Sequence, residues 1–264
     1  MRRTRRAAQA GLPRGQRAVS PHVTISEHDG VRYLHFGSEW VQGAMRIARP
    51  FALELEYQQQ MMAPLLFVPE PRRVVQLGLG AAALAKACWR ALPHAEILAV
   101  EISAEVAAAA RQWFKLPASD RLTVTLDDAE SFVAHPRRRA IADWLQVDLY
   151  DAEARGPVCD DPAFYRNCRK LLARPGVAAF NLFGRSFEPS FGRIARAFDD
   201  RAIVLPEAEA GNRIVLAFTG ATLRLPFAEL YRRAGDIEQA HRLPARRWVS
   251  GLKAANGMGS DFVL

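Results

Sequence analysis

Acidic side chains follow three successive strand-like segments in the middle of the chain. The segments are residues 97–100, 121–126 and 141–148, and the acids at their ends are Glu101, Asp127, Asp128 and Asp148. Segments of this length, rich in apolar and β-branched residues, predict strands. The carboxyl ends of parallel strands lie along one edge of a sheet, where ligands of open α/β sheets bind. We therefore expect these carboxylates to converge on one site.

Asp151 lies three residues after Asp148, in a segment that reads as a loop over the same edge, so both carboxylates can face one pocket. Two carboxylates suit an amine nucleophile, because a primary amine has a pKa near ~10.4 and must lose a proton before it attacks carbon. One acid can bind a remote ammonium group while the other accepts the proton. The alternative is that the two aspartates only cap the loop.

Residues 74–101 read as a βαβ unit. The apolar run 74–77 is followed at once by Gly78 and Gly80, and then by a helix of small residues. Glycines allow a sharp turn and a close approach of a ligand to the backbone beside the N-terminus of the helix. Such a turn can also serve packing alone. Glu101 favours ligand binding, because we expect a carboxylate at a strand tip to have little structural use.

The glycine pattern also indicates the kind of ligand. Ala83 stands near the position of the third glycine of the dinucleotide fingerprint, which favours S-adenosylmethionine or a relative over NAD. We expect Glu101 to bind the ribose hydroxyls. Asp128 and Ala129 are expected to hold the adenine edge, and Asp148 to stand near the reacting centre.

The remaining patterns divide the chain into three parts. Residues 1–20, which carry six arginines and no acid, predict a disordered basic arm, with nucleic-acid contact or a targeting peptide as alternatives. Residues 21–68 predict a small antiparallel hairpin unit, turning at Asp29-Gly30, and a linking helix. Residues 69–264 predict the α/β domain. Its last 40 or so residues predict one amphipathic helix and an ill-defined tail.

Composition limits the classes of protein. The chain has 264 residues, of which 50% are hydrophobic and 24% charged, and this suits one large domain with a small appendage. Its three cysteines are too few and too irregularly spaced for a disulfide framework or a zinc site. This predicts a reducing cytoplasm and no metal. No apolar run has the length of a membrane span, so we expect no membrane contact.

Charge is unevenly distributed along the chain. The formal net charge is +8, yet residues 127–161 hold nine acids and four arginines. An acidic segment inside a basic protein suits a small cationic substrate better than a phosphate backbone. We therefore expect a small cationic amine as the partner, and no nucleic acid.

Four short motifs occur in the order found in one enzyme family. They are VVQLGLG at 74–80, AVEIS at 99–103, LDDA at 126–129 and VDLYD at 147–151, and Gly156-Pro157 and Phe164-Tyr165 follow them. With these motifs, the chain resembles the spermidine synthase family, the polyamine aminopropyltransferases, from about Gln42 to Phe183. The resemblance implies a Rossmann-like core of the S-adenosylmethionine-dependent methyltransferase type, preceded by a small N-terminal antiparallel β unit.

The resemblance also implies an activity. An aminopropyl group would move from decarboxylated S-adenosylmethionine to a polyamine such as putrescine, releasing methylthioadenosine without a metal. It implies that Asp148 is the base and Asp151 the amine anchor, that Gln42 contacts the nucleoside, and that Tyr57 lines the amine pocket. The implied nucleoside-binding residues are Gly78, Gly80, Glu101, Asp128, Ala129 and Asp148. A homodimer is also expected.

The chain departs from the family at four positions. Ala81 replaces the aspartate that holds the ammonium of the donor, Gln58 and Gln59 replace a His and a Glu, and Ala152 replaces a Pro. Loss of a carboxylate that pairs with a buried ammonium weakens binding unless another acid replaces it. Two alternatives stay open: a methyltransferase that uses ordinary S-adenosylmethionine, whose donor carries its own carboxylate, and a catalytically silent paralogue.

Overall fold

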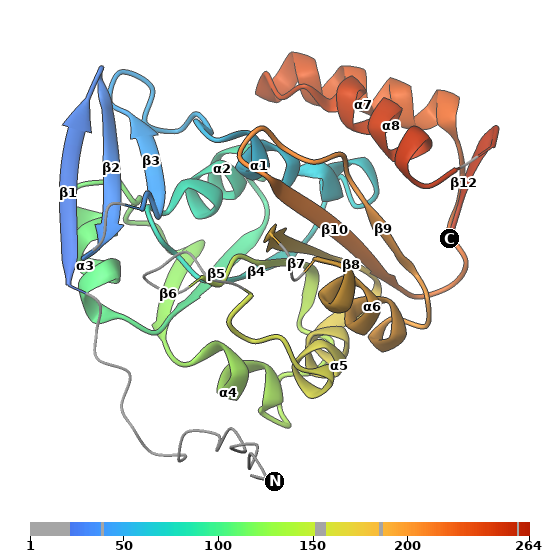
Figure 1. Ribbon diagram of the computed structural model, residues 1–264, viewed down its shortest axis with the longest axis horizontal. Helices are drawn as coiled ribbons and strands as arrows, with labels where there is room; N and C mark the ends of the chain where they lie inside the picture. Colours follow the sequence, from blue (N-terminus) through green and yellow to red (C-terminus); the bar gives the residue numbers. More distant parts are fainter. Residues whose placement is uncertain (1–21, 38–39, 151–156, 185–186, 258) are drawn as a thin grey trace, which may run out of the picture.

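The computed structural model describes residues 22–37, 40–150, 157–184, 187–257 and 259–264. The predicted basic arm and Asp151 lie outside these ranges. Within them, the chain folds as a mixed α/β protein around one seven-stranded sheet, with a small antiparallel sheet at its N-terminal side (Figure 1). The predicted fold class is confirmed.

The central sheet has the strand order β6-β5-β4-β7-β8-β10-β9. Its strands are β4 (Arg73–Leu77), β5 (Glu96–Glu101), β6 (Leu122–Leu126), β7 (Ala142–Val147), β8 (Leu172–Phe183), β9 (Ala202–Val204) and β10 (Asn212–Thr219). The first five strands of that order are parallel, whereas β10 runs antiparallel to both β8 and β9. Because β4 has β5 on one side and β7 on the other, the carboxyl ends of β4 and β7 form the topological switch point of the sheet.

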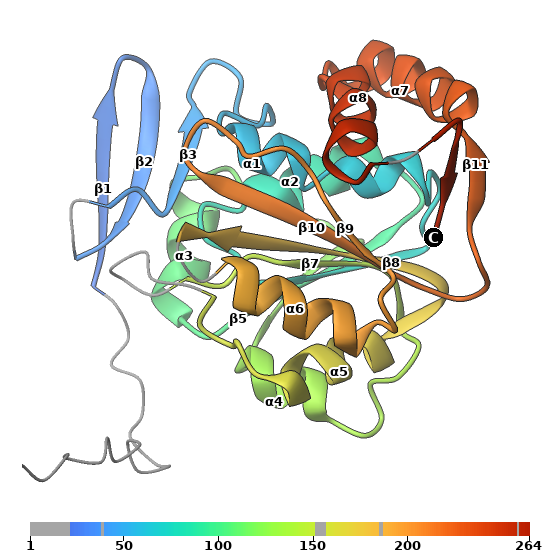
Figure 2. The same cartoon turned by 45° about the vertical axis from the view of Figure 1, so that its right-hand side comes forward.

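Helices cover both faces of this sheet (Figures 1 and 2). One face packs against α2 (Ala83–Ala91), α7 (Phe227–His241), α8 (Ala245–Ala255) and the segment that holds α1 (Glu56–Gln60) and the 3-10 helix η1 (Ala63–Leu66). The other face packs against α4 (Ala129–Ala134), α5 (Pro162–Leu171) and α6 (Phe187–Ala197). Double coverage explains why β4 and β7 are apolar along most of their length. No helix in the described ranges combines the length and apolar content needed to cross a membrane.

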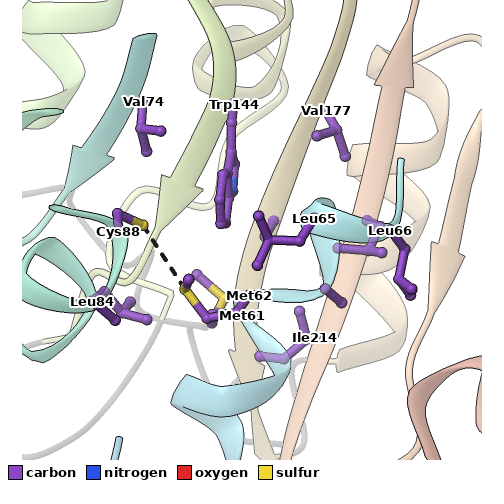
Figure 3. Packing of buried hydrophobic residues seen from close by; sticks show 14 of the residues in the cluster. Met61, Met62, Leu65, Leu66, Val74, Leu84, Cys88, Trp144, Val177 and Ile214 are labelled. Carbon is purple, nitrogen blue, oxygen red and sulfur yellow. Dashed lines mark hydrogen bonds between the residues drawn. The ribbon is translucent and has the colours of Figure 1, made fainter. Parts of the chain in front are cut away.

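The linking segment contains two short helices. Helix α1 ends at Gln60, and η1 begins at Ala63 with Pro64 in its first turn, where a proline needs no hydrogen-bonded N–H. Met61 and Met62, between the two helices, are buried and lie near Cys88 and Trp144 in the core (Figure 3). This packing fixes α1 over the carboxyl edge of the sheet.

The N-terminal unit is a three-stranded antiparallel sheet of β1 (Val23–His28), β2 (Val31–Phe36) and β3 (Gly43–Arg46). Asp29 and Gly30 both have positive φ, 48° and 72°, as a two-residue hairpin turn requires. Leu34 and Met45 of this sheet pack against Val106 of α3 (Ala104–Gln112). The predicted hairpin unit is therefore present and carries one more strand.

The C-terminal prediction is wrong. Instead of one helix and an ill-defined tail, α7 and α8 form a pair, and β12 (Asp261–Val263) pairs with β11 (Arg224–Pro226). Helix α7 ends at His241, its C-cap residue Arg242 has a left-handed φ of 57°, and Pro244 precedes α8. The tail is ordered because Phe262 is fully buried against Phe67 and Phe218.

Candidate active site

The glycine turn lies at the switch point, directly after β4. Gly78 has a φ of +87°, and a Cβ atom there would lie 2.2 Å from the carbonyl oxygen of Asp148. Only glycine satisfies both the left-handed conformation and this close approach. Gly80 has a φ of +51°, and a Cβ atom added to it would lie 3.5 Å from the carbonyl oxygen of Gln42. The turn therefore lies between the end of β7 and the N-terminal unit.

Glu101 ends β5 beside this turn and is 8% exposed. Its two carboxylate oxygens accept hydrogen bonds from the backbone N–H groups of Leu79 and Ser103, both at 2.9 Å. Burial raises the pKa of this carboxyl, and the backbone hydrogen bonds oppose that rise. The expectation that a strand-tip acid has little structural use is therefore wrong, because Glu101 also holds the glycine turn.

The aspartate pair after β6 is held in a similar way. Asp128 is the N-cap of α4 and accepts a hydrogen bond from the backbone N–H of Ser131 at 2.8 Å, and Ala129 is the first residue of that helix. Asp127 forms an ion pair with Arg138 at 2.9 Å. Helix α4 thus fixes Asp128 and Ala129, which are predicted to bind adenine, at the edge of the sheet.

Asp148 follows β7 and is surrounded by side chains. Its Oδ1 accepts a hydrogen bond from Nδ2 of Asn181 at 2.9 Å, and the hydroxyl of Tyr57 lies 3.5 Å from Oδ2, the long limit of a hydrogen bond. Asn212 donates to Oδ1 of Asn181 at 3.0 Å, and the hydroxyl of Tyr150 donates to the backbone oxygen of Asn181 at 3.0 Å. Burial raises the pKa of Asp148, while the hydrogen bonds from Asn181 and Tyr57 oppose the rise.

Sequence reasoning missed Asn181 and Asn212. Asn181 stands in β8 and Asn212 at the start of β10, and the two strands pair antiparallel. The available signal was one amide side chain within the apolar run 177–183. Buried polar groups are normally hydrogen-bonded, and the amide of Asn181 therefore requires a partner. The local sequence does not predict which residue that partner is.

One cavity of about 750 Å³ joins these groups. It extends from the N-terminal unit, across the glycine turn, to the loop before β10. Eight of the nine predicted site residues line it, and Asp151 lies outside the described ranges. The eight are Gln42, Tyr57, Gly78, Gly80, Glu101, Asp128, Ala129 and Asp148.

The charged side chains of the cavity have one sign. Among its described lining residues there is no Lys, Arg or His, and there are seven acids: Glu54, Glu56, Glu101, Asp127, Asp128, Asp148 and Glu209. Arginines outside the lining pair with two of them, Arg46 with Glu54 and Arg138 with Asp127. The remaining five give the cavity a negative potential that attracts cations.

Ala81 fills the position where the family carries an aspartate. It is 3% exposed and belongs to the core cluster beneath the N-terminal sheet. A Cβ atom added to Gly43 of β3 would lie only 2.5 Å from Cβ of Ala81. The close contact indicates that β3 packs directly on this alanine.

The described residues offer little to a metal ion or to thiol chemistry. Across the described part of the chain, no group of three His, Cys, Asp or Glu side chains could hold a metal ion. Cys159 lines the cavity, but burial raises the pKa of its thiol to about 12. A thiol with that pKa is protonated at neutral pH, so it is a poor nucleophile.

Comparisons with known proteins identify the family. No family model matches the chain. A polyamine aminopropyltransferase of Neisseria meningitidis serogroup B is 31% identical over 240 residues, which cover 89% of this chain and 90% of the relative.

Two solved structures share the fold. A probable spermidine synthase from Corynebacterium glutamicum ATCC 13032 has a TM-score of 0.68 at 20% identity, covering 87% of this chain and 91% of that one. The human methyltransferase-like protein 13 in complex with SAH has a TM-score of 0.63 at 22% identity, covering 71% of this chain and 92% of that one. The fold is thus common to both kinds of transferase, and by its sequence the chain belongs to the polyamine aminopropyltransferase family.

Proposed function

We propose that the protein transfers an aminopropyl group from decarboxylated S-adenosylmethionine to a small polyamine such as putrescine and releases methylthioadenosine. The observation that carries this proposal is the cavity charge, with seven acids and no basic side chain among the described lining residues. The decarboxylated donor carries a sulfonium and an ammonium, and the acceptor is also a cation. All these groups suit a negative lining. The carboxylate of ordinary S-adenosylmethionine would find no basic side chain among the described lining residues, and burying an unpaired charge is costly.

The proposed reaction is a direct displacement. The acceptor nitrogen attacks the carbon beside the sulfonium, a C–N bond forms, and the electrons of the broken C–S bond stay on sulfur as a neutral thioether. The nitrogen loses one proton, and Asp148 accepts it. Because burial raises the pKa of this carboxyl, it is a stronger base than an exposed aspartate.

The hydrogen bonds around Asp148 support this role. Asn181 occupies Oδ1, while Oδ2 has only the 3.5 Å contact with Tyr57 among described residues. We therefore assign proton acceptance to Oδ2. Asp151 would bind the distal ammonium of the acceptor. Alignment of the two substrates would supply most of the rate enhancement.

The rest of the cavity would bind the nucleoside. Glu101 would bind the ribose hydroxyls, and Asp128 with Ala129 would hold the adenine edge. Gln42, close to Gly80, would contact the nucleoside from the side of the N-terminal unit. Homodimer formation stays a prediction, and so does the cytoplasmic location, which rests on the small number and irregular spacing of the cysteines.

A methyltransferase is the second candidate. The observation that favours it is Ala81, buried under β3 where an aspartate would otherwise hold the donor ammonium. The likeness in fold to methyltransferase-like protein 13 fits the same candidate. Deprotonation of an amine by Asp148 would serve methyl transfer equally well.

Isothermal titration with methylthioadenosine, S-adenosylhomocysteine and decarboxylated S-adenosylmethionine tests the proposal, together with an assay of methylthioadenosine release in the presence of putrescine. We expect binding of methylthioadenosine and of the decarboxylated donor, and release that depends on the amine. Preference for S-adenosylhomocysteine without release would support the methyltransferase. Binding without any turnover would support the silent paralogue, and no binding of any nucleoside would refute the site.

A further inference from the structure

The chain enters the described structure at the rim of the acidic cavity. His22 is the first described residue, and β1 begins directly after it at Val23, which pairs with Phe36 at the end of β2. Phe36 lines the cavity, and so does Trp40 in the connection to β3. Trp40 is 59% exposed, so this part of the wall forms the mouth of the cavity. The predicted basic arm, residues 1–20, is therefore attached beside the mouth.

The basic arm and the cavity carry opposite charge. The arm holds six arginines and no acid. The described lining of the cavity holds seven acids and no basic side chain, and within the described part of the chain arginines pair with only two of these acids. A cleft lined by charges of one sign concentrates counter-ions. The chain thus carries a polycation of its own at the edge of a cavity that attracts cations.

Two acids of the lining lie together where a large cation can contact them. Glu56 begins α1 and Glu209 lies in the loop before β10, and the backbone N–H of Glu209 donates to Oε2 of Glu56 at 2.7 Å. Glu56 is half-buried and Glu209 is exposed, so a guanidinium group can bind them without losing all of its water. The exposed indole of Trp40 offers a face on which a second guanidinium can stack. This part of the wall therefore suits arginine side chains.

We propose that the basic arm docks in the mouth of the cavity through its arginines and competes there with the acceptor amine. The inference rests on the proposed function, in which the acceptor is a cation that binds in the same acidic cavity. Arg17 lies five residues before His22, and an extended chain spans ~3.3–3.6 Å per residue, so Arg17 reaches roughly 17 Å from that point. A segment attached to its own site has an effective concentration on the order of millimolar, so weak ion pairs suffice for competition.

The competition should act on the acceptor and spare the nucleoside. The arm supplies cations, but it contains no aromatic side chain that could take the place of adenine. In the proposed function the ribose binds at Glu101, which is only 8% exposed. The arm should therefore raise the KM for the acceptor amine and leave the affinity for methylthioadenosine unchanged. It should also leave kcat unchanged, because saturating amine displaces the arm.

A charge-neutralised arm in the full chain tests this competition. The arm variant carries four substitutions: Arg2→Gln, Arg3→Gln, Arg5→Gln and Arg6→Gln. We expect its KM for putrescine to fall several-fold, with kcat and the dissociation constant of methylthioadenosine unchanged. The matched control loses the same charge at four exposed arginines outside the cavity lining, through Arg137→Gln, Arg139→Gln, Arg166→Gln and Arg174→Gln. Salt screens distant charges, so its KM should change less than about twofold.

A second measurement does not depend on turnover. A labelled synthetic peptide with the sequence of residues 1–17 is titrated into the arm variant, and its fluorescence anisotropy reports binding. We expect the peptide to bind and putrescine to displace it. Adding Glu209→Gln to the arm variant should weaken peptide binding several-fold. Glu207→Gln is the matched control, because Glu207 is an exposed acid of the same loop that does not line the cavity.

The outcomes separate this proposal from the proposed function. If no amine gives release of methylthioadenosine, aminopropyl transfer fails, and the peptide titration still tests the docking. A peptide that does not bind, or that binds equally well after Glu209→Gln, refutes the docking alone. An equal fall of KM in the surface control would assign the effect to overall charge and refute it too. If the arm variant keeps the KM of the wild type and loses affinity for polyuridylate, the arm serves nucleic acid and the proposal is wrong.

Discussion

The two ends of the cavity hold their carboxylates by different means. At the end proposed to bind the nucleoside, backbone N–H groups of Leu79, Ser103 and Ser131 hold Glu101 and Asp128. At the end proposed to hold the reacting groups, the side chains of Tyr57 in α1 and Asn181 in β8 contact Asp148, and Asn212 of β10 holds Asn181. The first arrangement follows from the local course of the chain. The second exists only after distant strands have paired, so the two ends should respond differently to substitution.

Asp148→Asn should have the largest effect on activity. This effect should be confined to the end of the cavity that holds Asp148. Removal of the general base is expected to lower kcat by about 10²–10⁴-fold, the usual contribution of a positioned base. The affinity for methylthioadenosine should change less than about twofold, because no bond at the nucleoside end involves this side chain. Steady-state kinetics and titration calorimetry measure the two effects. Equal losses in kcat and in the affinity for methylthioadenosine would show that the two ends of the cavity do not act independently.

Gly78→Ala should damage both ends at once, since Gly78 bonds to β5 and packs on Asp148. We expect a loss of about 1 kcal/mol in the free energy of unfolding from the positive φ, and about 1–3 kcal/mol more from the clash. Gly30→Ala is the matched control, because Gly30 has a φ of +72° and no atom within 4 Å of a Cβ atom. Denaturant unfolding measures the difference, and equal losses in the two variants would contradict the clash.

Asn181→Ala should affect the reacting end in a pH-dependent way. Asn181 donates to the charged form of Asp148, so its loss raises further a pKa that burial has already raised. Because the base must be ionised, the acidic limb of the kcat profile should move to higher pH, with a loss of about tenfold at neutral pH. Asn212 contacts Asp148 only through Asn181, so Asn212→Ala should move the acidic limb less. An unchanged limb would show that Asn181 does not tune Asp148.

Ser103→Ala should have the smallest effect. The side chain caps α3 by accepting from Val106 at 3.3 Å, and loss of a cap costs about 1 kcal/mol of stability. The bond to Glu101 comes from the backbone N–H, which alanine retains. Thermal unfolding should detect the loss, while titration with methylthioadenosine should show no change in affinity. Weaker nucleoside binding would mean that the hydroxyl also serves the site.

The same division explains what could be predicted from sequence. The positions of Glu101, Asp128 and the glycines at strand ends are predictable because each follows or ends a strand whose apolar pattern is local. The hydrogen-bond partner of Asp148, Asn181, cannot be predicted in this way, because its own bond to Asn212 depends on the register of β8 and β10. Gln58 was recognised only as a departure from a motif. The order of the C-terminal tail depends on an aromatic contact between Phe67 and Phe262, which no local pattern reports.

The main-chain bonds to Glu101 have a consequence for how the enzyme can change over evolutionary time. Every residue except proline supplies a backbone N–H, so most substitutions at Leu79 or Ser103 preserve the donors that hold this carboxylate. Each link around Asp148 is a single side chain that one mutation can remove. Proteins that diverge from this one should therefore keep nucleoside binding and change the acceptor that they use. Only the residues around Asp148 can vary without loss of binding at Glu101.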